Sequence, residues 1–159
     1  MRNNLWAPWR IRYILSGNKK GCFLCKTESS SKKFILYKGK YAFVILNIFP
    51  YNNGHLMIAP YRHIKEIEKL NEDEEKEIFS CIKISLKILK KILKPDGFNI
   101  GINIGKCAGA GLPGHLHFHI VPRWEGDTNF MPVIGNTKII SQSISELYKI
   151  LKKEFSSSK

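Results

Sequence analysis

Three histidines stand at every second position in the segment His115-Leu116-His117-Phe118-His119. Successive side chains of a β-strand point to opposite faces, so the imidazoles would line one face and the apolar side chains the other. The whole chain has only 5 histidines, and three stacked imidazoles are poor material for a core. We therefore predict that the histidine side meets a cleft, a ligand or a metal, while the apolar side packs on the core.

Two kinds of chemistry suit this row of histidines. A neutral imidazole is available near pH 7, and one ring nitrogen can attack phosphorus while the other stays hydrogen-bonded. Alternatively, His115, His117 and His119 chelate a catalytic metal that activates water, as in a metallohydrolase. No acidic residue adjoins the row to act as a partner or base, which weighs against the metal.

A glycine-rich segment, KCAGAGLPG (106–114), leads directly into the histidine row. Its Gly109, Ala110 and Gly111 can present backbone N–H groups to phosphate oxygens. The alternative is a flexible turn without a ligand. Because the segment runs straight into the row, we favour phosphate contact.

The elements that must hold these residues follow from the pattern of apolar side chains. A helix is predicted over 71–94, because Asn71 and Glu74 have capping-box spacing and Pro95 follows the last apolar turn. A second amphipathic helix is predicted over 140–155, with a frayed tail at 156–159. Short strands are predicted at 34–37, 41–49, 55–60, 98–105 and 115–121. Strands followed by a helix and then more strands favour an α+β fold, with an antiparallel sheet of about five strands.

Length and composition limit the class of protein. The 159 residues suffice for one compact domain, here 1–159 with a basic N-terminal arm at 1–20. No apolar run reaches the length of about 20 residues that spans a bilayer, and the N-terminus has no continuous apolar signal core. The 4 cysteines are too few for a disulfide scaffold. These observations predict a cytoplasmic protein.

The formal net charge of +13 suits a polyanionic ligand, although it also fits a solubility effect alone. A non-catalytic nucleotide or nucleic-acid binder is therefore a further hypothesis, with Trp6, Trp9 and Trp124 as candidate stacking residues. Nothing in the strands has the pattern of an RNA-stacking sheet, and we expect these tryptophans to anchor the arm and loop. Nucleic acid is consequently not the expected partner.

The histidine row resembles the motif His-φ-His-φ-His-φ-φ (φ, apolar) of the HIT, or histidine triad, superfamily of nucleotide hydrolases and transferases. The resemblance extends over LWAPWR (5–10), GCFLC (21–25), GAGLPGHLHFHIVPRW (109–124) and GDTNFMP (126–132). These segments look like a bacterial branch that includes dinucleoside tetraphosphate hydrolases and phosphorylases. The resemblance implies an α+β HIT domain, a homodimer, and a dinucleoside polyphosphate substrate such as diadenosine tetraphosphate.

The resemblance also implies roles for individual residues. His117 would attack the α-phosphorus, with its second ring nitrogen held by the main-chain carbonyl of His115, and water or phosphate would release the nucleotide. His119 would donate to a non-bridging phosphate oxygen, and His55 would flank the same phosphates. Asn47 resembles a position that contacts the nucleoside sugar, while its alternative role is a turn asparagine.

One departure from many relatives is the lack of a Ser or Gln side chain shortly before the histidine row. Ala110, Gly111, Leu112 and Pro113 occupy that stretch. How the leaving group is stabilised, and whether water or phosphate is the acceptor, therefore stay open at this point.

A structural zinc is the expected cofactor, and no organic cofactor is expected. Cys22 and Cys25 form a C-x-x-C pair that can hold one tetrahedral zinc with two further ligands. The pattern resembles zinc-bearing members of the superfamily that use two Cys and two His, here His63 and His115. The alternative is a small apolar turn with free thiols.

Overall fold

The computed structural model describes residues 21–25, 34–128, 130, 134 and 139–157. The strands of this part of the chain form one antiparallel sheet of five strands in the order β1-β2-β3-β5-β4. Their bounds are Ile35–Lys38 (β1), Ala42–Leu46 (β2), Leu56–Pro60 (β3), Gly97–Ile102 (β4) and Phe118–Arg123 (β5). The helices are α2 (Glu72–Leu93), α4 (Ile144–Ser157) and two short 3-10 helices, η2 (Ile67–Lys69) and η3 (Lys106–Ala108). The α+β prediction is confirmed.

The long helix α2 begins and ends where its sequence signals predict. The side chain of Asn71 accepts a hydrogen bond from the backbone N–H of Glu74, and the carboxylate of Glu74 accepts one from the N–H of Asn71. These two bonds satisfy amides that a helix start leaves without intrahelical partners. The C-cap, Lys94, is left-handed at φ 47°, and Pro95 cannot continue the helix.

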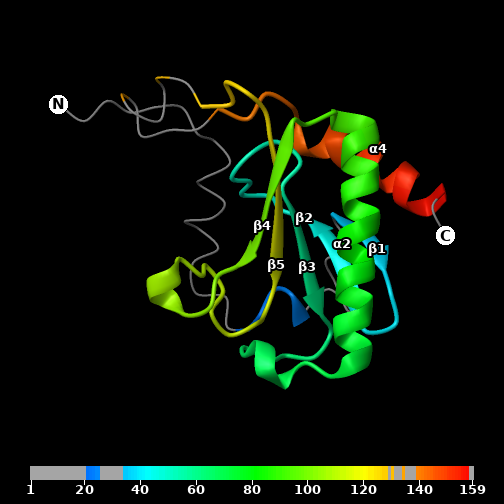
Figure 1. Cartoon of the computed structure of the whole chain (residues 1–159), viewed down its shortest axis with the longest axis vertical. Helices are drawn as coiled ribbons and strands as arrows, with labels where there is room; N and C mark the ends of the chain where they lie inside the picture. Colours follow the sequence, from blue (N-terminus) through cyan, green and yellow to red (C-terminus); the bar gives the residue numbers. More distant parts are fainter. Residues whose placement is uncertain (1–20, 26–33, 129, 131–133, 135–138, 158–159) are drawn as a thin grey trace.

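One face of the sheet, called here the helix face, is covered by α2 and α4. Figure 1 shows α2 running along the sheet and α4 crossing near one of its ends. Apolar side chains from four strands (β1, β2, β3 and β5) and from both helices form one buried cluster between the layers. Its buried members include Leu36, Val44, Ile58, Ile120 and Phe155. Removal of this apolar surface from water is the main force that joins the layers.

The opposite face, called here the histidine face, carries a second and smaller apolar cluster. Its buried members are Leu24, Ile35, Phe43, Ile45, Met57 and Ala59. Leu24 belongs to the short segment between the two cysteines of the C-x-x-C pair and is only 1% exposed. That segment is therefore packed onto the same side of the sheet as the histidines.

The side chain of Glu77 joins α2 to the hairpin between β1 and β2. Its carboxylate accepts hydrogen bonds from the backbone N–H groups of Lys40 (2.9 Å), Tyr41 and Ala42 (2.7 Å). A Cβ atom at Gly39 would collide with this carboxylate. The hairpin turn thus needs glycine because the helix side chain occupies the space beside it.

Several predicted boundaries are wrong by a few residues. The second strand ends at Leu46 rather than 49, because the side-chain oxygen of Asn47 accepts the N–H of Phe49 and forms a turn. The last strand starts at Phe118 rather than 115 and continues through Pro122. A proline is accepted there because β3 pairs with β5 only as far as Ile120, so Pro122 has β4 alone as its neighbour. The helix α4 continues to Ser157, into the tail expected to fray.

The predicted N-terminal arm, 1–20, lies outside the described residues. Among the helices of the described part, none is both long and apolar enough to cross a bilayer.

Candidate active site

The three histidines of the row lie on the histidine face, as their spacing predicts. His119 stands in β5 opposite Met57 of β3 and Gly101 of β4. His115 and His117 precede β5, where the chain leaves the ladder because the N–H of Leu116 donates to the carbonyl of Ile64. All three imidazoles are buried.

The ring of His117 is held by the main chain of the first histidine in the row. Its Nδ1 lies 2.8 Å from the carbonyl oxygen of His115. A carbonyl only accepts, so Nδ1 carries the proton and donates it. In the neutral ring the other nitrogen, Nε2, keeps its lone pair, which is the state that a nitrogen nucleophile requires.

His55 and His119 form a second, connected pair. His55 Nδ1 accepts from the backbone N–H of Tyr51 (3.0 Å) and lies 3.2 Å from Nδ2 of Asn47. Because an amide N–H can only donate, the proton of neutral His55 is on Nε2, which lies 2.8 Å from Nδ1 of His119. His119 must therefore accept at Nδ1 and carry its own proton on Nε2.

The Nε2 atom of His119 is buried and has no hydrogen-bond partner among the described residues. A buried donor without a partner costs free energy, typically about 1–3 kcal/mol. Such a donor beside a nucleophile is suited to an acceptor atom of a ligand.

Burial keeps this pair of rings uncharged. Removal from water, followed by the nearby His119 and His117, lowers the pKa of His55 to about 3. Burial, followed by the nearby His117, lowers the pKa of His119 to about 4. Both rings are therefore neutral at physiological pH. Their hydrogen bonds alone decide which nitrogen of each ring carries the proton.

Tyr51 is a site residue that the sequence analysis missed. Its ring stacks on His119, with centroids 5.5 Å apart, and lies 4.6 Å from the ring of His55. Its backbone N–H also fixes the proton position on His55. The available signal was an aromatic residue inside the loop that joins Asn47 to His55.

The loop from Asn47 to His55 is shaped by its own polar groups. Asn47 ends β2 with its side chain bonded on both sides, to Phe49 and to His55. Just before His55, Gly54 has φ +76°, and a Cβ atom there would collide with Leu93 at the end of α2. Glycine is thus required for the chain to turn into β3 beside the helix.

Some backbone N–H groups of the glycine-rich segment before the row are hydrogen-bonded within the segment. The N–H of Gly109 donates to the carbonyl of Lys106 (3.0 Å), and that of Ala110 donates to Gly105 (3.3 Å). Of the three residues predicted to face phosphate, these two have amides engaged within the loop. Gly111 keeps an N–H for which the described residues provide no acceptor.

The four predicted metal ligands meet at one point. The ligand atoms of Cys22, Cys25, His63 and His115 all lie within 4.8 Å of one another, and they form the one such group among the described residues. Nδ1 of His115 is 3.3 Å and 3.4 Å from the sulfurs of Cys22 and Cys25, and Nδ1 of His63 is 3.1 Å from that of Cys25. Tetrahedral zinc places such N and S ligands about 3.6 Å apart, from its bond lengths of about 2.0 and 2.3 Å.

The side chain of His115 points away from the other two histidines of the row. Its Nε2 donates to the carbonyl of Pro60 (2.9 Å), so its Nδ1 is unprotonated and directed at the cysteines. Nδ1 of His117 is bonded to a carbonyl. The three rings thus do not converge on one metal, which removes support from the metallohydrolase hypothesis.

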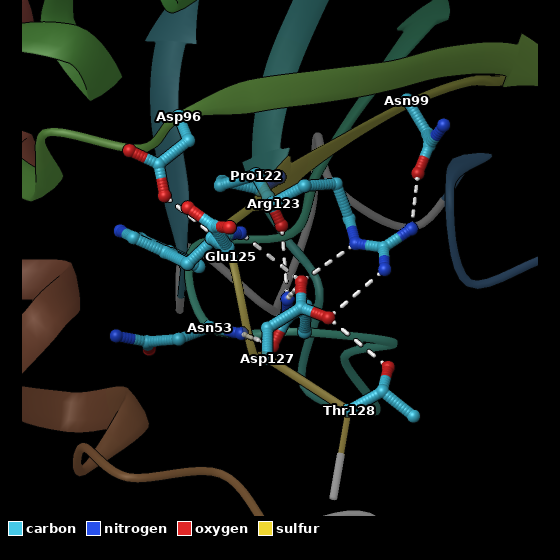
Figure 2. A network of polar contacts seen from close by, with 10 residues as sticks. Asn53, Asp96, Asn99, Pro122, Arg123, Glu125, Asp127 and Thr128 are labelled. Atoms are coloured by element: carbon cyan, nitrogen blue, oxygen red, sulfur yellow. Dashed lines mark hydrogen bonds and ion pairs between the residues drawn. The ribbon is translucent and has the colours of Figure 1, made fainter.

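A network around Asp127 fixes the loop beside these rings (Figure 2). Its carboxylate accepts from Nε and Nη2 of Arg123 (2.6 and 2.9 Å), from Nδ2 of Asn52 (2.7 Å) and from the N–H of Trp124 (3.2 Å). Asn52 also donates to the carbonyl of Pro122. Because Asn52 follows Tyr51 directly, the network ties the loop next to His55 to the end of β5. No role was predicted for Asp127 from the sequence.

Comparison with known proteins agrees with this geometry. The HIT domain model matches residues 28–126. An AP-4-A phosphorylase of Mycobacterium tuberculosis is 35% identical over 95% of this chain and 83% of its own length. A hypothetical histidine triad nucleotide-binding protein from Sulfolobus tokodaii aligns with a TM-score of 0.70 and 27% identity, over 86% of this chain and 93% of the other. A Zn-bound histidine triad family protein from Mycobacterium smegmatis has the same fold, with a TM-score of 0.70 and 23% identity over 87% and 95%. The chain described here is therefore a member of the HIT domain family.

Proposed function

We propose that this protein is an enzyme that cleaves dinucleoside polyphosphates, such as diadenosine tetraphosphate, at the α-phosphate through a nucleotidyl-histidine intermediate. One observation carries the proposal: the carbonyl of His115 holds the Nδ1–H of His117, which leaves Nε2 as a free nucleophile. The relative in Mycobacterium tuberculosis is named an AP-4-A phosphorylase and aligns with 95% of the chain.

In the first step, Nε2 of His117 attacks the α-phosphorus and a P–N bond forms. The bond from that phosphorus to the bridging oxygen breaks, and the oxygen leaves with its electron pair as a nucleoside polyphosphate. In the second step, water or inorganic phosphate attacks the same phosphorus and the P–N bond breaks. Two displacements of moderate difficulty replace one difficult displacement.

The neighbouring donors act on the phosphate oxygens. Nε2–H of His119 donates to a non-bridging oxygen, where negative charge is concentrated in the transition state. His55 keeps this donor in place, because its own Nε2–H occupies the acceptor side of the His119 ring. Gly111 adds its backbone N–H, and Gly109 and Ala110 shape the turn that carries it.

Asn47 has a double role in this proposal. Its Nδ2 group has two protons and lies within hydrogen-bond distance of His55, so one proton is left for a ribose hydroxyl. The nucleoside whose phosphate is attacked then lies on the Asn47 side of the histidines. A nucleic acid and a membrane are not partners in this proposal.

We further propose that Cys22, Cys25, His63 and His115 hold a structural zinc ion. The donor set and the ligand spacing suit tetrahedral zinc, and His115 is already unprotonated on the ligating side. A bound ion links the segment that carries Leu24 to the start of the histidine row. Its chemistry is that of a cross-link, and the reaction itself uses the nitrogen atoms of the row.

The chain is proposed to act as a single HIT domain over 1–159, in the cytoplasm, as a homodimer. Strand β4 lies at the edge of the sheet, and Ile100 and Ile104 on and next to it are each 45% exposed. An edge strand with exposed apolar side chains is a common pairing surface between copies. Sedimentation of the wild type and of Ile100→Glu tests this, and a monomeric wild type contradicts it.

The reaction is tested by incubation with diadenosine tetraphosphate, with and without inorganic phosphate. AMP plus ATP as products identify water as the acceptor, whereas ADP plus ATP identify phosphate. Rapid acid or denaturant quenching is expected to trap a nucleotide on His117, located by mass spectrometry of peptides. Nucleotide binding without turnover would instead support the non-catalytic binder, and turnover by His117→Ala at the wild-type rate would rule out the mechanism.

A further inference from the structure

A hollow on the histidine face lies beside the catalytic rings and has no role in the steps above. Its volume is about 290 Å³, and it is lined by Tyr51, Asn52, Asn99, Val121 and Arg123. Protein sites for whole small molecules begin at about 300 Å³. The hollow lies at this lower limit, so its size suits a nucleoside better than a whole dinucleotide.

The position of the hollow continues the row of histidines along the sheet. Val121 and Arg123 follow His119 at alternate positions of β5, so their side chains share its face. At about 3.3 Å per residue, they stand about 7 and 13 Å beyond His119. A phosphate chain that starts at His117 and runs past His119 would bring its far end over these residues.

The floor of the hollow is open because β4 has few side chains there. Gly101, Asn99 and Gly97 pair with His119, Val121 and Arg123 and point to the same face. An added Cβ atom at either glycine would meet nothing within 4 Å. Of the three β4 positions on this side, only Asn99 carries a side chain.

Two flat groups border this space. The ring of Tyr51 is stacked against His119, yet the residue is 50% exposed, so part of its surface is available to a ligand. The guanidinium of Arg123 is held on three sides, by two bonds to Asp127 and one of 2.7 Å to Asn99 (Figure 2). Aromatic rings and guanidinium planes are the surfaces on which nucleic-acid bases stack.

The charge of the hollow favours a base over a phosphate. The one cation in its lining, Arg123, is paired bidentately with the carboxylate of Asp127, which is 6% exposed. This pair carries no net charge, and Asn99 adds an amide group that can hydrogen-bond a base or a ribose. Both amide protons of Asn52, by contrast, are already donated to Pro122 and Asp127. An uncharged, amide-bearing hollow with flat walls is suited to a nucleoside.

We propose that this hollow is the subsite for the second nucleoside of the substrate, the one that leaves with the polyphosphate, with its base stacked on Tyr51. The proposal rests on the proposed function and adds a reason for a dinucleoside substrate. The first nucleoside lies on the Asn47 side of the histidines, the second lies on the Arg123 side, and the phosphates bridge them.

The test compares two substrates that share the attacked phosphate. Diadenosine tetraphosphate has a second nucleoside, and adenosine 5′-tetraphosphate has the same number of phosphates without it. Tyr51→Leu removes the stacking surface, and Tyr51→Phe keeps it as the matched control. The measured quantity is the kcat/KM for diadenosine tetraphosphate divided by the kcat/KM for adenosine 5′-tetraphosphate. A loss of activity that arises because Tyr51 no longer contacts His119 affects both substrates and cancels in this ratio.

We expect Tyr51→Leu to lower this ratio about 10-fold, which is the effect of losing one stacked base, and Tyr51→Phe to leave it unchanged. Asn99→Trp, which fills the hollow from an exposed position, should lower the ratio similarly. Phe79→Trp, at an exposed position of α2 on the other side of the sheet, should not change it. Equal losses on both substrates in Tyr51→Leu and Asn99→Trp would overturn the subsite, whereas a wild type that cleaves neither substrate would overturn the proposed function instead.

Discussion

The two faces of the sheet are built from the same strands but are stabilised in different ways. On the helix face, apolar side chains from α2, α4 and the strands form one continuous cluster. On the histidine face, a smaller apolar cluster lies beside four buried histidines, His55, His115, His117 and His119. The first face is held by apolar burial, which is non-directional, and the second by hydrogen bonds of fixed direction.

This difference explains why the chemistry is confined to one face. Each hydrogen-bonded nitrogen of these four rings faces a group of definite type: a carbonyl, an amide, a thiol or another ring. The partners decide which nitrogen carries the proton. A buried face that is polar therefore specifies protonation as well as position, and it leaves one donor, Nε2 of His119, for the ligand.

The largest expected effect is on activity alone. His117→Ala should lower kcat by at least about 10³-fold, because no other group can form the P–N bond. Its melting temperature should stay close to that of the wild type. Steady-state kinetics with diadenosine tetraphosphate, together with thermal unfolding, measure both quantities. If the melting temperature fell strongly as well, His117 would also stabilise the fold, which would contradict the proposed difference between the two faces.

The reverse pattern is expected on the helix face. Phe155→Ala removes a fully buried ring of α4 and should lower the free energy of unfolding by about 3–5 kcal/mol. The matched control is Phe79→Ala, because Phe79 of α2 is 60% exposed, and its effect should be within about 0.5 kcal/mol. Urea titrations measure both values, and equal effects would contradict the assignment of the core.

Metal binding should stabilise the histidine face. Zinc at about 100 times its Kd should add about 2.7 kcal/mol of stability, or about 5–11 °C in Tm for a chain of this size. Cys25→Ser should abolish the shift, while Cys107→Ser, which changes an exposed cysteine away from the ligand group, should keep it. An equal shift in both variants would mean that the ion binds elsewhere.

The Asp127 network should matter for orientation more than for the global fold. Asp127→Asn removes the charge from a carboxylate that is 6% exposed and should cost about 2 kcal/mol of stability. It should also lower kcat, because Asn52 and the adjacent Tyr51 lose their anchor beside His55. Glu125→Gln changes an exposed neighbour and serves as the control. An unchanged kcat in Asp127→Asn would show that the loop from Asn47 to His55 keeps its conformation without the Asp127 network.

The smallest effect expected is a pH dependence of stability. The pKa of His55, about 3 in the folded state, lies below its usual value of about 6.5. Between pH 6.5 and pH 3 the unfolded chain binds a proton at this ring and the folded chain does not. The free energy of unfolding therefore falls as the pH falls below about 6.5, and this ring does not change it at higher pH. Each such ring contributes about 1 kcal/mol between pH 6 and pH 5. His55→Gln should flatten that slope, and an identical slope in thermal unfolding would contradict the burial argument.

The sequence predicted the fold well where a pattern is long or strictly periodic. The helix over Asn71–Lys94 and the alternation of His115 to His119 gave both the layers and the face that carries the histidines. The ends of the strands were less predictable. Asn47 ends β2 through a side-chain bond to Phe49, and Pro122 is accepted in β5 because β3 has already ended. The first outcome depends on one local side-chain hydrogen bond and the second on the order and length of the neighbouring strands, and the apolar pattern shows neither.

The site was predictable as a set of residues but not as a network. The grouping of Cys22, Cys25, His63 and His115, and the bond from His117 to the carbonyl of His115, match the placement that the family resemblance implied, while metal binding by the four stays a prediction. Tyr51 and Asp127 were missed, because their importance comes from what they touch after folding. An aromatic ring in a loop and a single carboxylate have no distinctive spacing in the sequence.

His115 illustrates how differently two functions of one residue respond to evolution. Its side chain faces the two cysteines, whereas only its main-chain carbonyl holds His117. Any amino acid can supply the carbonyl, but few can supply the imidazole nitrogen. A lineage could therefore replace this histidine, lose the proposed metal site and the cysteines with it, and still retain a correctly oriented nucleophile. The second histidine of the row has no such freedom.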